Sequence, residues 1–167
     1  MMQIKLYKSS INSDKTRFEL DIHSDTNVLG KGCRMLHDFD RRVKVTGYDT
    51  KDGSKLCPTM TCVLAYDHPQ TSKPYLMFDN QDIQIYHFEH HLRCPIQCRT
   101  NWIKINETTK YQSKAPDDST NYLQLKDTSD EEGDSLNIPF QLSVVTSYFP
   151  LLKPTNAELE DDLITKI

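Results

Sequence analysis

The predicted fold class depends on residues 32–43, which read Gly-Cys-Arg-Met-Leu-His-Asp-Phe-Asp-Arg-Arg-Val. Apolar side chains recur here at intervals of three or four residues, which is the spacing that places them on one face of an α-helix. Because Gly30 and Gly32 weaken a first helical turn, we expect an amphipathic helix that begins near Gly32 and ends before Gly47. Its apolar stripe consists of Leu29, Cys33, Leu36, Phe39 and Val43.

Alternating apolar and polar residues on both sides of this helix predict β-strands. Residues 2–8 and 17–23 alternate in this way, and we expect the two segments to pair as a hairpin. Further strands are expected at 57–66, 74–78, 83–87, 102–105 and 122–125. We therefore predict an α+β fold, in which an antiparallel or mixed sheet carries one main amphipathic helix packed on it and a short C-terminal helix.

The predicted core combines the apolar faces of these elements. The C-terminal helix is expected to begin at residues 155–158, Thr-Asn-Ala-Glu, which form a capping-box sequence. The core is expected to include Leu20, Ile22, Leu36, Phe39, Val63, Leu64, Ile85, Trp102, Ile103 and Ile105.

Composition divides the chain into three parts. Residues 1–111 form the predicted globular core domain, 112–135 a flexible acidic loop, and 136–167 an apolar docking segment with the C-terminal helix. Residues 1–56 carry 11 Lys/Arg against 8 Asp/Glu, whereas 113–167 carry 4 against 11. This asymmetry indicates either contacts with an anionic surface at one end and basic partners at the other, or a solvated acidic tail.

The segment from Ile138 to Leu152 is too apolar to lie free in water. It must dock either on its own domain or on another subunit. The long polar loop before it favours another subunit, because such a loop can reach a neighbouring molecule. The expected self-assembly residues are Ile138, Phe140, Leu142, Val144, Tyr148, Phe149, Leu151 and Leu152.

No catalytic signature is present, and we predict that the protein is not an enzyme. The five glycines do not form a phosphate-binding loop, and neither a G-x-S-x-G elbow nor an H-E-x-x-H pair occurs. No stretch approaches the ~18 apolar residues that span a bilayer, and the N-terminus lacks the features of a secretory signal. We therefore expect neither secretion nor a transmembrane segment. The five cysteines then indicate free thiols rather than a disulfide framework.

A cluster of histidines and cysteines suggests zinc as an alternative to a protein without cofactors. The candidate ligands are His87, His90, Cys94 and Cys98, and His91 belongs to the same cluster. The spacings argue against a zinc site, because Cys94 and Cys98 form a C-x3-C pair and Cys57 and Cys62 a C-x4-C pair, not the compact C-x2-C knuckle. We therefore favour no metal and no cofactor, with core cysteines and surface histidines.

Two charged segments are candidates for contact or regulation. The basic contact patch consists of Lys31, Arg34, Arg41, Arg42 and Lys44. It is interpreted either as the solvent face of the predicted helix or as a contact with an anionic membrane or another subunit, without recognition of a specific nucleic-acid sequence. In the acidic loop, Thr128 and Ser129 precede Asp130-Glu-Glu and are candidates for phosphorylation.

The order of these features resembles the core of rhabdovirus matrix proteins, especially the short forms of plant viruses. A strand at 18–23 is followed by the helix at 32–43, a buried segment at 57–66, and Cys94-Pro-Ile before a strand with Trp102. The resemblance covers residues 16–108. It implies a viral structural protein that self-assembles and links the nucleocapsid to the inner face of the membrane.

The partners implied by the resemblance are a second copy of the chain, the viral nucleoprotein and an anionic membrane surface. The implied locations are the virion and the host cytoplasm, at the inner face of the membrane. The alternative hypothesis is a small cytosolic or nuclear regulatory adaptor, with or without a stabilising zinc ion, that binds host factors.

Overall fold

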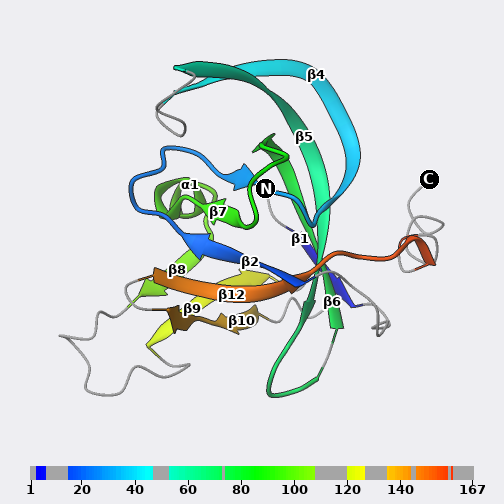
Figure 1. Cartoon of the computed structure of the whole chain (residues 1–167). Helices are drawn as coiled ribbons and strands as arrows, with labels where there is room; N and C mark the ends of the chain where they lie inside the picture. The colour runs from blue at the N-terminus through cyan, green and yellow to red at the C-terminus, as the bar shows by residue number, and fades with distance from the viewer. Residues whose placement is uncertain are drawn as a thin grey trace.

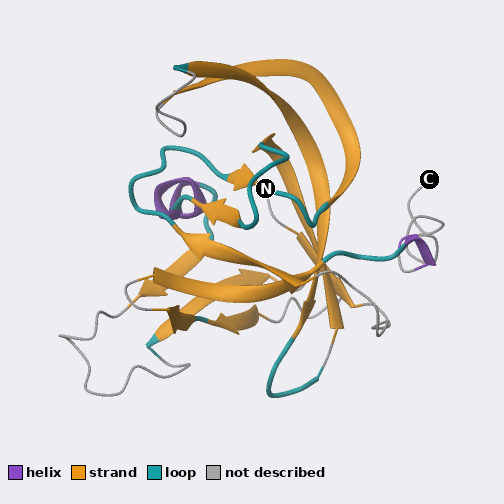
Figure 2. Cartoon of the chain, viewed as in Figure 1, coloured by secondary structure: helices purple, strands orange, loops and turns teal. Residues whose placement is uncertain are grey.

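The computed structural model describes residues 3–6, 15–46, 53–72, 74–107, 120–126, 135–143, 146–157 and 159. Strands make up most of this part of the chain, with helix only at α1 and in a short turn close to the C-terminus (Figure 2). The elements are, in chain order, β1 (Gln3–Leu6), β2 (Lys15–Leu20), β3 (Val28–Leu29), β4 (Arg34–Thr46), β5 (Ser54–Asp67), β6 (Pro74–Gln84), β7 (His91–Arg93), α1 (Pro95–Thr100), β8 (Lys104–Glu107), β9 (Asn121–Lys126), β10 (Ser135–Pro139), β11 (Gln141–Ser143) and β12 (Thr146–Leu152).

The predicted α+β fold with a main amphipathic helix is wrong, because the residues assigned to that helix lie largely in β4, a strand of 13 residues. The register between β4 and β5 shifts twice, once between Met35 and His37 and once between Asp38 and Arg42. Each bulge inserts extra residues into β4. The spacing of the apolar side chains is therefore stretched from two towards the three or four residues of a helix.

The large sheet closes on itself. Of its nine strands, six pair in the cyclic order β6-β3-β7-β2-β12-β5, and β5 pairs back with β6. The pairs β2–β7 and β3–β6 are parallel, and the other pairs in the ring are antiparallel. Two of the strand pairings are short, because β3 pairs with β7, and β12 with β5, through a single residue pair each. A closed ring buries its inward side chains from every side, and this gives the protein its main core.

A second sheet, in the order β10-β9-β8, shares that core. Ile105, Leu123 and Ile138 come from its three strands and pack in one cluster with Phe18 and Met60 of the ring. The strand expected at 122–125 is thus present as β9, within the segment predicted as an acidic loop. Residues 112–119 and 127–134 of that loop lie outside the described residues.

The predicted core is confirmed in part. Leu20, Val63, Leu64, Ile85 and Ile105 are buried. Leu36 and Ile103 are half-buried and pack against the buried clusters. Three expected core residues are exposed, and the prediction was wrong for them: they are Ile22, Phe39 and Trp102.

Trp102 is the clearest of these errors, because 96% of its surface is exposed. It has a φ of 62° in the turn after α1, so it does not continue the alternation of the strand that follows. Ile22 lies two residues beyond the end of β2, and Phe39 lies in the second bulge of β4. Each residue sits where regular strand geometry ends, and sequence alternation does not reveal such ends.

The segment expected to dock on its own domain or, more favourably, on another subunit pairs with strands of the same chain. β12 pairs with β2 over five residues, from Tyr148↔Glu19 to Leu152↔Lys15, and β10 pairs with β9. Figure 1 shows β12, in orange, running beside β2. The physical reason for this packing is that β12 is the strand that joins β2 to β5 in the closed sheet. In this position its apolar side chains are removed from water without a neighbouring molecule.

The individual side chains of that segment follow this placement. Ile138, Phe140, Phe149 and Leu151 are buried, Tyr148 and Leu152 are half-buried, and Leu142 is exposed. Val144 lies outside the described residues. Of the predicted C-terminal helix, positions 156, 157 and 159 are helical, and the amide of Leu159 donates to the carbonyl of Thr155. Positions 158 and 160–167 lie outside the described residues.

Phe149 offers a direct test of this placement. Its ring lies 5.5 Å from that of Phe18 and 6.2 Å from that of Tyr66, between centroids, and it is fully buried. We expect Phe149→Ala to lower the free energy of unfolding by about 3–5 kcal/mol, measured by urea denaturation of the monomer. The matched control is Leu142→Ala in the same segment, which should cost less than about 0.5 kcal/mol because Leu142 is exposed. Equal small losses in both variants would contradict the placement of β12.

Candidate functional site

A buried arginine connects three strands of the closed sheet. Arg93, at the end of β7, is 1% exposed, and its guanidinium donates to both carboxylate oxygens of Asp79 on β6, with Nη1 at 3.1 Å from Oδ1. Its Nη1 lies 3.7 Å from Oδ2 of Asp82, also on β6. The guanidinium carbon sits 4.1 Å from the centroid of the Phe18 ring. We call these four residues the Arg93 centre.

The two carboxyl groups of the Arg93 centre have opposite pKa shifts. Burial opposes the ionisation of Asp79, yet the charge and the hydrogen bonds of Arg93 outweigh it, so the pKa of Asp79 is lowered. Burial and the adjacent charge of Asp79 hold the pKa of Asp82 well above its usual range. Arg93 therefore favours the ionised form of Asp79, whereas burial beside Asp79 favours the neutral form of Asp82.

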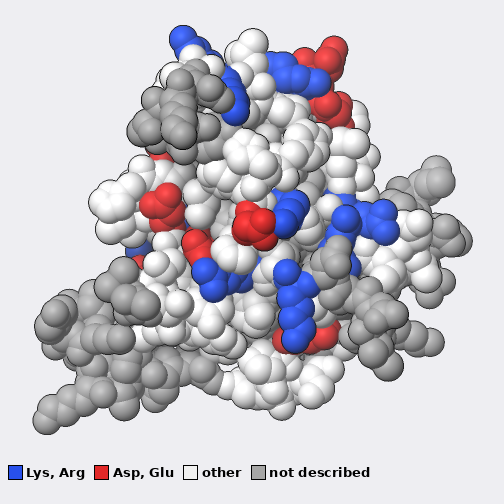
Figure 3. All heavy atoms as spheres, viewed as in Figure 1, with Lys and Arg blue, Asp and Glu red and all other residues white. Residues whose placement is uncertain are grey.

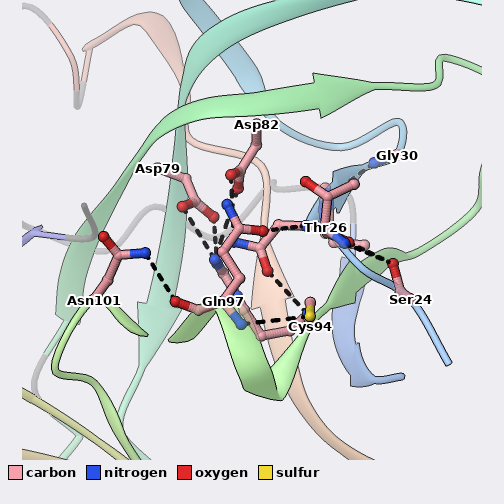
Figure 4. Close-up of polar contacts among 11 residues, drawn as sticks. Ser24, Thr26, Gly30, Asp79, Asp82, Cys94, Gln97 and Asn101 are labelled. Carbon is pink, nitrogen blue, oxygen red and sulfur yellow. Dashed lines mark hydrogen bonds and ion pairs between the residues drawn. The ribbon is translucent and has the colours of Figure 1, made fainter. Parts of the chain in front are cut away.

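A second set of hydrogen bonds ties the Arg93 centre to α1 (Figure 4). The side chain of Asn27 donates to Oδ1 of Asp82 at 3.3 Å and accepts from the amide of Cys94 at 2.9 Å. The backbone amide of Asn27 donates to Oε1 of Gln97 at 2.6 Å. Cys94 caps α1, because its Sγ accepts from the amide of Gln97. The loop before β3, the strand β6 and the helix α1 thus meet at one point.

The Arg93 centre has no room for a substrate. The cavity beside it has a volume of about 20 Å³ and is lined by residues that include Asn27, Asp82 and Asn101. A space of this size is large enough for about one water molecule. Strongly shifted pKa values at an enclosed ion pair indicate a structural network as well as they indicate catalysis. We therefore assign the Arg93 centre a structural role.

His91 is a second buried titratable group, next to the Arg93 centre. Its Nδ1 accepts from the amide of Gly30 at 3.1 Å, and its Nε2 has no hydrogen-bond partner in the described part of the chain. Burial, aided by the charge of Arg93, lowers the pKa of His91 to about 3. Gly30 is required here, since a Cβ atom would lie 2.3 Å from the carbonyl oxygen of His90.

The predicted zinc ligands are not brought together. His87 is exposed and His90 half-buried, while Cys94 caps α1 and Cys98 is buried within it. Burial raises the pKa of the Cys98 thiol to about 11, which disfavours the thiolate that zinc binds. Among the residues that the structure describes, no group of three or more His, Cys, Asp or Glu side chains is arranged to hold a metal ion.

A groove lies under the hairpin formed by β4 and β5. This hairpin is a long curved arm that bends over the rest of the molecule at the top of Figure 1. The groove has a volume of about 370 Å³, within the range of small-ligand sites. We call it the arm groove, and its lining residues are Asp25, Thr26, Arg41, Val43, Lys44, Val45, Thr46, Thr59, Gln81 and Ile83.

Only two residues of the predicted basic contact patch line the arm groove, Arg41 and Lys44. Arg42 forms a two-point ion pair with Asp38, with Nη1 at 3.0 Å from Oδ1. Blue and red atoms lie side by side at the bend of the arm in Figure 3. By contrast, neither Arg41 nor Lys44 has a side-chain partner among the described residues. Both cations are therefore available to a ligand.

The other two members of the predicted patch already have partners elsewhere. Lys31 pairs with Glu89 at 2.5 Å, and Arg34 donates to the backbone carbonyl of Pro154 at 2.9 Å. The candidate phosphorylation residues, Thr128 and Ser129, lie outside the described residues.

Thr59 is the feature of the arm groove that sequence reasoning missed. It is 5% exposed, and its hydroxyl Oγ1 is buried without a hydrogen-bond partner in the described structure. An unpaired buried hydroxyl costs free energy, so it is expected to find a partner. A threonine in an apolar strand gives no sequence signal of this kind, because the missing partner is a property of the fold.

His91 makes the stability of the protein depend on pH. A histidine that is neutral when folded, with a pKa of about 3, contributes stability that is complete above the ordinary histidine pKa and is lost as pH falls from about 6.5 towards 3. We expect His91→Asn, which keeps an acceptor for the Gly30 amide, to lower this slope by up to about 1.4 kcal/mol per pH unit. The measurement is urea unfolding at pH 7, 5 and 4.

The control for this experiment is His23→Gln, because His23 is exposed and should leave the slope as it is. Asp82 changes the stability with pH in the opposite direction, because its raised pKa favours the folded state at low pH. It is present in all the proteins compared, and the difference therefore isolates His91. Parallel slopes in wild type and His91→Asn would show that His91 is not the group that titrates.

Comparison with known proteins gives no indication of function. A scan against protein-family models, a search of curated proteins and a search of solved structures each found no match. Within the described residues, no helix combines the length and apolar character needed to cross a lipid bilayer. The strongest basis for a function is therefore the arm groove.

Proposed function

We propose that this chain is a non-enzymatic binding protein that holds an oxyanion group of its partner in the arm groove. The observation that carries the proposal is the buried hydroxyl of Thr59, which lacks a hydrogen-bond partner in the described structure and lines the same groove as Arg41 and Lys44. Two cations at the concave surface, with a hydroxyl donor buried in the wall behind it, supply the charge and the hydrogen bond that a phosphate, sulfate or carboxylate group needs.

The composition of the arm groove supports binding of an anion. Thr26, Thr46 and Gln81 add neutral side chains that can donate hydrogen bonds. Asp25 is the one carboxylate of the lining, so the two cations leave the groove with a net positive formal charge. An anion bound beside Arg41 and Lys44 would be attracted by that field, most strongly at low salt.

The location of the shifted titratable groups supports binding rather than catalysis. Asp79, Asp82, His91 and Arg93 are all buried around the enclosed Arg93 centre. None of them lines the arm groove. A general acid or base must reach its substrate within hydrogen-bond distance, and these groups lie where no substrate fits. The proposal therefore assigns binding to the groove and stability to the centre.

A self-assembling, matrix-like structural role is the second candidate, and an adaptor role is compatible with either. The observation that favours self-assembly is the exposure of two large apolar side chains, Ile96 on α1 and Trp102 in the turn after it. Exposed aromatic side chains of this kind are frequent anchors of protein interfaces. On this view the oxyanion group would belong to a lipid headgroup or a phosphorylated nucleoprotein.

The binding proposal is tested by titrating the protein with inorganic phosphate and following backbone amide shifts by nuclear magnetic resonance. We expect shifts at residues that line the arm groove. Arg41→Gln and Lys44→Gln should each weaken binding about two- to fivefold. Thr59→Val should weaken it about fivefold or more without lowering stability, because valine has a similar shape and removes the unpaired hydroxyl.

Arg42→Gln is the matched control, since Arg42 neighbours Arg41 but pairs with Asp38 outside the groove. It should leave phosphate binding unchanged. An equal loss in Arg42→Gln would indicate a general charge effect. Unchanged binding in Thr59→Val would remove the observation on which the proposal rests.

The second candidate is tested by sedimentation over a range of protein concentrations. If the chain self-assembles through the α1 side, Trp102→Ser should remain monomeric at concentrations where wild type associates. Leu56→Ser is the control, because Leu56 is 71% exposed on the arm and is equally apolar. Association that persists in Trp102→Ser would exclude the proposed anchor.

A further inference from the structure

Two cysteine thiols lie in contact at the base of the arm. Cys33 directly precedes β4, and Cys62 lies on β5. Their Sγ atoms are 3.4 Å apart. Oε1 of Gln84 lies 3.3 Å from Sγ of Cys33 and 3.8 Å from Sγ of Cys62, so both thiols meet one acceptor. The Gln84 side chain is fixed in turn, because its Nε2 donates to the carbonyl of Gly30 at 2.9 Å.

The two thiols differ in access and acidity. Cys33 is half-buried and Cys62 is fully buried. A hydrogen bond from Cys62, with a smaller contribution from the charge of Lys153, lowers the pKa of Cys33. The same contact and burial raise the pKa of Cys62. The more accessible thiol of the pair is therefore also the better nucleophile, and its neighbour remains protonated.

We propose that Cys33 and Cys62 form an oxidation site, at which a hydroperoxide converts the two thiols into a disulfide across the base of the arm. The Cys33 thiolate attacks the peroxide; its S–O bond forms as the O–O bond breaks, and one water or alcohol leaves. The Cys62 sulfur then attacks the resulting sulfenic acid. The S–S bond forms, the S–O bond breaks, and the departing hydroxide takes the Cys62 proton and leaves as water. Two thiols are oxidised and one peroxide is reduced.

The geometry requires only a short movement. A disulfide has an S–S length of about 2.05 Å, so the sulfur atoms must approach by roughly 1.3 Å, which a change of side-chain torsion can supply. Cys33 lies outside the regular ladder, since the first β4 pair is Arg34↔Val63. Its backbone is therefore freer to adjust than that of Cys62, which pairs on both sides with β4 and β6.

The bond would join the start of β4 to the middle of β5 and close a loop that contains the arm. It would thereby hold the two strands of the arm together at their base. This site does not depend on the oxyanion proposal, because none of its residues lines the arm groove.

The test is to treat the reduced protein with hydrogen peroxide at increasing ratios, and to map the products by mass spectrometry without reduction. We expect the first product to have lost two hydrogen atoms, to retain three of its five free thiols, and to contain a peptide linked through Cys33 and Cys62. Dithiothreitol should restore the starting mass. The melting temperature should rise on oxidation, since the bond restricts the unfolded chain.

Matched variants separate this pair from general thiol oxidation. Cys33→Ser and Cys62→Ser should both prevent the crosslink, and Cys62→Ser should stop at an oxidised Cys33. Cys57→Ser is the control and should form the crosslink as wild type does, because Cys57 is buried in a different cluster. A disulfide between other cysteines, or sulfinic acid at Cys33 without a crosslink in wild type, would overturn the proposal. If a variant fails to fold, the peptide map of the wild-type protein alone tests the proposal.

Discussion

The buried ion pair between Arg93 and Asp79 is the constraint on which the rest of the structure depends. Moving a guanidinium group out of water costs several kcal/mol, and only close, well-aligned partners offset this. Here Asp79 supplies both carboxylate oxygens, and Phe18 covers the guanidinium with its ring. Removing one member of such a pair typically costs about 3–5 kcal/mol. The strands β6 and β7 must therefore stay in the positions that keep the pair together, and β3 lies between them.

This constraint also explains why the C-terminal strand belongs to the core. The ring around Arg93 closes only when β12 joins β2 to β5, and β12 comes from the far end of the chain. Phe149 then packs against Phe18, which is the residue that covers the guanidinium. Closure through such distant segments delays core formation until most of the chain has folded. The apolar character of residues 138–152 thus serves the ring, in which Phe149 and Leu151 are buried.

Sequence reasoning found strands where alternation is regular and failed where it is interrupted. Residues 17–23 and 57–66 alternate or remain apolar, and the structure places β2 and β5 there. The bulges of β4 imitate helical spacing, and this one error changed the fold class. Of the candidate site, Arg41 and Lys44 could be named from their charge. Thr59 and the Cys33–Cys62 contact could not, because a missing hydrogen-bond partner and a distance between strands exist only after folding.

The features that misled the sequence prediction also shape how a partner can approach the arm. Among the strands that the structure describes, β4 pairs with β5 alone, which leaves its outer edge open there, and an open edge invites strand addition. Two bulges, the left-handed backbone of Asp40 and the Asp38–Arg42 ion pair interrupt that edge. Natural proteins use bulges and charges of this kind to block edge pairing. The proposed oxyanion partner would therefore approach the concave side of the arm, where Arg41 and Lys44 line the groove beside Thr59.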